Sequence, residues 1–156
     1  MGLEKIQIDS MGKILESILK SDILFFDYIL ISKNIQKINT PSKIVEFDFT
    51  FSSEKNNRWF FIRIQDFFSH QKLIIMLNQL NEKKNVNIDI QSFFISKLKN
   101  NTIKQKMIFK STSEVELKNQ LERIFEYLIE NSDNQLKEII NGELWIDMPF
   151  DWSDYK

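Results

Sequence analysis

The chain has 156 residues, a net charge of −1 and no cysteine. A chain of this length predicts a single globular domain, residues 1–156, with a substantial hydrophobic core. The lack of cysteine excludes disulfides, thiolate nucleophiles, zinc–thiolate sites and iron–sulfur clusters.

The first predicted element is a helix over residues 10–20, where apolar residues recur on one face. The pattern of residues 22–38 is compatible with either a helix or a strand. Their β-branched and aromatic content would suit a buried strand, but their apolar residues recur at intervals of four and three, which favours a helix. We interpret the segment as a helix that ends before Pro41. The residues at these intervals are Leu24, Tyr28, Ile31, Ile35 and Ile38.

The strongest pattern in the chain predicts a β-hairpin over residues 44–65. Large apolar residues alternate with polar ones, which is typical of half-buried strands. A two-residue turn at Asn56 and Asn57 would set Phe51 opposite Ile62 and place the large apolar residues of both strands on one face. The predicted core face consists of Phe47, Phe49, Phe51, Phe60, Ile62 and Ile64.

The other face of the hairpin carries Trp59 and Phe61 among charged residues. Glu46 and Asp48 share this face and could bind a divalent cation or act as acid and base. The simpler interpretation is a cross-strand ion pair, in which Arg63 lies diagonally from Asp48. Because the face is so aromatic, we expect either the C-terminal segment or a partner to cover it.

After the hairpin the patterns are mixed. Ser69 predicts the start of a helix over residues 70–81. Residues 86–99 are open between strand and helix, because they alternate first and then adopt helical spacing. Residues 103–110 alternate apolar residues with lysine, as an exposed or edge strand does.

Two further helices are predicted towards the end of the chain. Ser113 and Glu116 form a capping box in front of a long apolar stripe. A short helix over residues 136–140 ends near Gly142. The prediction is therefore an α+β fold, with an antiparallel sheet of about four strands centred on the 44–65 hairpin and helices packed on one face.

Few residues suggest catalysis. His70 is the only histidine, and the chain lacks the glycine-rich motifs that bind phosphate. We therefore expect a protein that is not an enzyme, with no catalytic residue, metal or cofactor. One alternative is a small metal-dependent hydrolase or nuclease that uses the hairpin carboxylates. A second is a nucleic-acid binder that uses the lysines of residues 97–110.

The C-terminal segment is rich in aromatic and acidic residues. Trp and Tyr anchor protein interfaces, and flanking acids steer a basic partner. The alternative is that these aromatic residues fold back and close the open face of the sheet. The predicted partner-binding residues are Trp145, Asp147, Asp151, Trp152, Asp154 and Tyr155, together with Trp59 and Phe61.

The longest apolar run, residues 23–31, is too short to span a bilayer, so we expect a soluble cytoplasmic protein with no membrane partner. In general character, a small, cysteine-free, slightly acidic α+β protein is similar to bacterial immunity proteins and antitoxins. The similarity concerns overall character, and no motif carries it. It implies a protein-binding module that neutralises a protein partner, such as a toxin domain with a basic surface.

Overall fold

The computed structural model describes residues 3, 6–21, 25, 27–39, 43–53, 58–82, 88–94, 107–131 and 135–140. The helices are α1 (Ile8–Lys20), α2 (Glu114–Asn131) and α3 (Gln135–Ile140). The strands are β1 (Ile29–Asn39), β2 (Lys43–Ser52), β3 (Arg58–Asp66), β4 (Gln71–Glu82), β5 (Ile88–Phe94) and β6 (Ile108–Phe109). The strands form one antiparallel sheet in the order β1-β2-β3-β4-β5, with the short β6 beside the start of β4.

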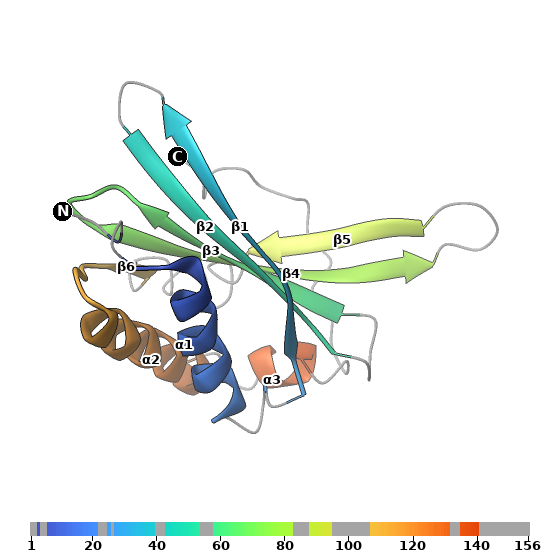
Figure 1. Ribbon diagram of the computed structural model, residues 1–156. Coiled ribbons are helices and arrows are strands. Elements are labelled where there is room, and N and C mark those ends of the chain that lie inside the picture. Colours follow the sequence, from blue (N-terminus) through green and yellow to red (C-terminus); the bar gives the residue numbers. More distant parts are fainter. Residues whose placement is uncertain are drawn as a thin grey trace.

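The predicted α+β fold is confirmed. Figure 1 shows α1 and α2 side by side on one side of the sheet, while β5 and the adjoining part of β4 extend away from them. The sheet is larger than predicted, because β1 and β4 occupy segments that the sequence patterns indicated as helices. The core lies between the helices and the apolar faces of the middle strands, and Phe49, Phe51 and Ile62 are fully buried there.

The hairpin is confirmed, but its predicted register is wrong by two residues. Phe51 pairs with Phe60 rather than with Ile62. The last described pair is Ser52 with Trp59, and the predicted turn at Asn56 and Asn57 lies outside the described residues. Side chains alternate with a period of two, so a slip of two residues leaves every residue on its predicted face. The six residues of the predicted core face are all buried.

Residues 29–39 form strand β1, so the helix predicted over residues 22–38 is wrong for this part. A bulge between Leu30 and Ser32 interrupts the alternation. Farther along, Ile35 pairs with Phe47 and Ile38 with Ile44, and these two pairs lie on opposite faces of the sheet. The intervals of three and four therefore imitate a helix although the side chains do not share a face.

The helix predicted over residues 70–81 is also wrong, because this segment is strand β4. β4 lies between β3 on one side and β5 with β6 on the other. Leu73, Ile74 and Ile75 are all nearly inaccessible to solvent. A strand buried on both faces shows a continuous apolar run, which periodicity alone cannot distinguish from a buried helix.

The remaining predictions agree with the described residues. Residues 88–94 adopt the strand alternative. Within residues 103–110 only β6 is a described strand, and residues 103–106 lie outside the described part. The backbone N–H of Glu116 bonds the Ser113 hydroxyl at 3.2 Å, which caps α2 as predicted. The Glu116 carboxylate bonds the N–H of Thr112 rather than that of Ser113.

Candidate functional site

Six of the predicted partner-binding residues lie outside the described part of the chain, so their role stays a prediction. These are Trp145, Asp147, Asp151, Trp152, Asp154 and Tyr155. The other two, Trp59 and Phe61, are half-buried on β3, on the sheet face opposite the helices. Of the lysines predicted to contact nucleic acid, only Lys110 is described, and its side chain is exposed.

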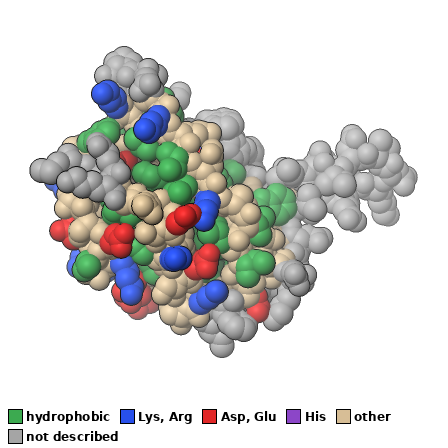
Figure 2. Space-filling model, in the orientation of Figure 1, with side chains coloured by type: hydrophobic (Ala, Val, Ile, Leu, Met, Phe, Trp, Pro, Cys, Tyr) green, Lys and Arg blue, Asp and Glu red, His purple; other side chains and the backbone are tan. Residues whose placement is uncertain are grey.

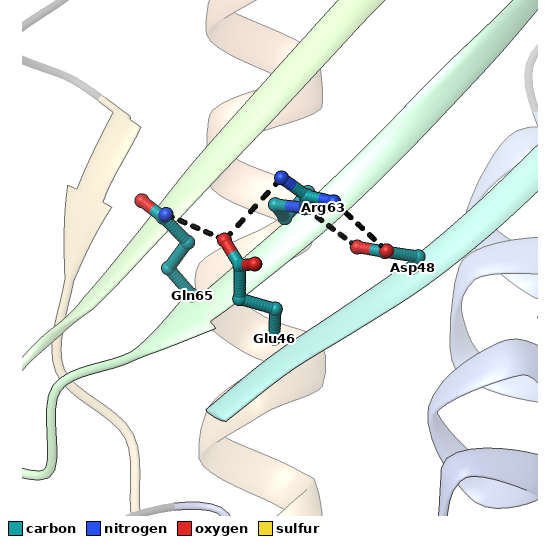
Figure 3. A network of polar contacts seen from close by, with 4 residues as sticks. All are labelled: Glu46, Asp48, Arg63 and Gln65. Carbon is teal, nitrogen blue, oxygen red and sulfur yellow. Dashed lines mark hydrogen bonds and ion pairs between the residues drawn. The ribbon is translucent and has the colours of Figure 1, made fainter. Parts of the chain in front are cut away.

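Arg63 on β3 binds two carboxylates of β2 (Figure 3). Its Nε donates to Asp48 Oδ1 at 2.7 Å and its Nη2 donates to Asp48 Oδ2 at 3.0 Å, which is the bidentate geometry that favours arginine. Its Nη1 lies 3.4 Å from Glu46 Oε2. The predicted ion pair is confirmed, and the corrected register places Arg63 directly opposite Asp48 instead of diagonally.

Both carboxylates of this polar network are buried. Glu46 is 3% exposed and Asp48 is 8% exposed. The amide of Gln65 donates to Glu46 Oε2 at 2.7 Å, and the Arg63 guanidinium lies 5.2 Å from the centre of the Phe61 ring. Two buried carboxylates therefore share one guanidinium. This geometry supports a role in holding β2 and β3 in register.

A second polar cluster surrounds Asp66 and was missed by the sequence analysis. Asp66 is fully buried at the end of β3. Its Oδ2 accepts from the Leu3 N–H at 2.7 Å, and its Oδ1 accepts from the Phe68 N–H at 3.0 Å and from the Gln71 amide at 3.1 Å. Gln71 Oε1 in turn accepts from the Ser111 N–H at 2.8 Å. The bond from the Phe68 N–H to the aspartate two residues before it forms an Asx turn, a local feature that gives no sequence signal for the contacts to Leu3 and Ser111.

A third set of polar contacts holds the C-terminal end of α3. Arg58 donates to the carbonyl of Ile139 and, at 3.2 Å, to Gln79 Oε1. The Tyr28 hydroxyl donates to the carbonyl of Ile140 at 3.2 Å. Burial lowers the pKa of the Arg58 guanidinium, and Tyr28 partly offsets this effect. A cation at the last carbonyls of a helix satisfies their hydrogen bonding and complements the helix dipole.

Of the five large apolar side chains exposed among the described residues, three lie on strand β1. It is the end strand of the sheet and pairs only with β2 among the described strands. Ile29 is 51% exposed, Ile31 is 58% exposed and Ile35 is 43% exposed. Lys33 forms an ion pair with Asp9 of α1, and this hydrogen bond and the charge of Lys33 lower the pKa of Asp9. Sequence reasoning missed this edge because the segment was interpreted as a helix.

Two general features complete the description of the surface. None of the described helices is long and apolar enough to cross a membrane. Among the described residues, no group of three or more His, Asp or Glu is placed to hold a metal ion. Comparison with family models, with curated proteins and with solved structures found no match to this chain.

Proposed function

We propose that this protein is a non-enzymatic binding module of the immunity-protein or antitoxin type, which binds a protein partner in the cytoplasm and neutralises it. The observation that carries the proposal is the exposed edge strand β1 with Ile29, Ile31 and Ile35. Natural proteins usually blunt or cover a long sheet edge, because its free backbone groups and apolar side chains recruit other chains. An edge that combines this length with large aliphatic side chains fits a surface used for binding.

The binding mode that fits this edge is the addition of an extended partner segment as a further strand. The outer backbone groups of β1 have no partner strand among the described residues. Main-chain hydrogen bonds would provide affinity, and Ile29 and Ile31 would provide apolar anchors. β1 carries Lys33 and Lys37 but no acid, so two copies of this strand would place like charges close together. The edge therefore favours a different chain over a second copy.

The acidic and aromatic C-terminal residues would provide a second contact. Asp147, Asp151 and Asp154 would attract a basic surface, and Trp152 and Tyr155 are residue types that anchor interfaces. The proposed partner is accordingly a toxin domain with a basic surface. Trp59 is only half-buried and would extend this contact onto the sheet.

The test uses the product of the neighbouring gene as the candidate toxin. Co-expression with this protein should restore growth of cells that produce the toxin. The double variant Ile29→Asp/Ile31→Asp should lose this protection and bind at least about 30-fold more weakly, because a central apolar anchor is worth about 2 kcal/mol. Val115→Asp is the matched control, since Val115 is 70% exposed on α2, away from the edge. Full protection by the double variant would show that β1 is not part of the interface.

The C-terminal contact has its own test. Trp152→Ala combined with Asp151→Lys should abolish co-purification with the same toxin while the melting temperature changes little. The reason is that an anchor and a steering charge are lost together, whereas exposed substitutions change stability by only about 0.5 kcal/mol. A large drop in melting temperature would instead assign these residues to the core.

A further inference from the structure

A mostly apolar pocket of about 600 Å³ lies between the start of α1, the end of β1, the start of β2 and the turn after β3. Its volume falls within the range of small-molecule sites, about 300–1,000 Å³. Figure 2 shows hydrophobic side chains gathered on this face, between α1 and the outer ends of β1 and β2, with Lys or Arg side chains above them. Seven apolar residues line the pocket: Ile6, Ile8, Ile35, Ile44, Val45, Phe47 and Phe68.

Two lysines also line this pocket, Lys37 from β1 and Lys43 from β2. Both are exposed, and neither has an ion-pair partner among the described residues, in contrast to Lys33 with Asp9. The pocket also borders the N-terminus of α1, the positive end of that helix. Positive charge thus lies beside apolar walls, which is the arrangement that suits a ligand with an apolar body and an anionic head.

The turn that places Phe68 against the pocket is conformationally strained. Phe68 has φ of 69°, in the left-handed region that bulky residues rarely occupy. The N–H of Ser69 bonds the carbonyl of Phe67 at 2.9 Å, and the N–H of Phe68 bonds the buried Asp66 carboxylate. Such strain persists only where the surrounding structure enforces it, and it is concentrated at ligand and functional sites. The surrounding fold therefore holds Phe68 in its position at the pocket wall.

We propose that this pocket binds a long-chain carboxylate, an amphiphile with a single alkyl chain. The alkyl chain lies against Ile35, Val45 and Phe68, and the carboxylate lies between Lys37 and Lys43. Charge complementarity selects an anionic head over a cationic one, and the apolar walls select a chain over a short acid. This site goes beyond the proposed function: it shares Ile35 with the exposed edge, but it uses neither Ile29 nor Ile31 and requires no protein partner.

The ligand test is a calorimetric titration of the full chain with dodecanoate below its micelle concentration. Dodecanoate should bind at one site, and decanoate should bind about 15-fold more weakly, because each buried methylene changes affinity about fourfold. Dodecyltrimethylammonium has the same chain but a cationic head, and it should not bind at this site. The proposal is overturned if dodecanoate does not bind, or if the ammonium compound binds as tightly.

Variants locate the binding in this pocket. Lys37→Glu/Lys43→Glu should weaken dodecanoate binding at least tenfold, whereas Lys13→Glu/Lys110→Glu, with the same net charge, should not. Ile35→Trp fills the pocket and should weaken binding to a similar extent, while Ile29→Trp, on the same strand outside the pocket, should have no effect. The melting temperature of each variant shows that it is folded. Unchanged binding in both pocket variants would place the ligand elsewhere and overturn the proposal.

Discussion

Arg63 holds two buried carboxylates, those of Asp48 and Glu46, across the β2–β3 pair. Removing the guanidinium leaves buried charge without compensation, which typically costs about 3–5 kcal/mol. We therefore expect Arg63→Met to lower the free energy of unfolding by this amount in urea denaturation. Arg63→Lys should fall between Arg63→Met and the wild type, because an ammonium retains the charge but not the two parallel hydrogen bonds.

The matched control at this scale is Arg123→Met, since Arg123 is exposed on α2. Its substitution should change the free energy of unfolding by no more than about 0.5 kcal/mol. A loss below about 1 kcal/mol for Arg63→Met, similar to the control, would show that solvent compensates the two carboxylates.

At the scale of the elements, α1 lies close to the sheet because Gly12 has no side chain. A Cβ at this position would lie 3.2 Å from Leu30 Cδ2 and 3.6 Å from Phe49 Cε1. Gly12→Ala should stay within about 1 kcal/mol of the wild type, since the gain in helix propensity offsets a small shift of the Leu30 methyl group. Gly12→Leu should destabilise the protein by about 1–3 kcal/mol through overpacking, as measured by urea denaturation.

Lys13→Leu adds the same side chain on the exposed side of α1 and serves as the control for Gly12→Leu. We expect it to remain within about 0.5 kcal/mol of the wild type. Equal stability of the two leucine variants would mean that α1 can move away from the sheet at little cost.

Alternation predicted β2 and β3 correctly because each has one apolar and one polar face. The prediction for the β4 segment was wrong for a physical reason. The run at Leu73, Ile74 and Ile75 is buried on both faces of the sheet, so no alternation of apolar and polar residues remains. β1 was wrong because its bulge and its exposed isoleucines break the period. The local sequence pattern predicts a strand when only one of its faces is buried. The burial of β1 and β4 depends instead on their positions in the sheet, which the local pattern does not contain.

The candidate site was predictable only in part. The Asp48–Arg63 pair followed from the hairpin alone, because both residues lie on its polar face. The Asp66 cluster joins residues 3, 66, 71 and 111, and no local pattern links positions so far apart. The edge and the pocket both depend on the position of β1 in the sheet, so they could not be identified while residues 22–38 were interpreted as a helix.

At the scale of the whole molecule, buried polar contacts link distant parts of the chain. Asp66 bonds Leu3, Gln71 bonds Ser111, and Tyr28 bonds the carbonyl of Ile140. The single domain stays a prediction, and these contacts support it. We expect one cooperative unfolding transition, with coincident midpoints from tryptophan fluorescence and far-ultraviolet circular dichroism. Two separated transitions would instead indicate two independently folding units.

The position of Asp66 also has a consequence for synthesis of the chain on the ribosome. Leu3 emerges before Asp66, whose carboxylate accepts the Leu3 N–H and emerges only once β3 is complete. The bond from Ser111 to Gln71 forms later still. Leu3 must therefore wait for more than sixty later residues before this bond can fix it in place. During that interval we expect the apolar face of α1 to be accessible to chaperones.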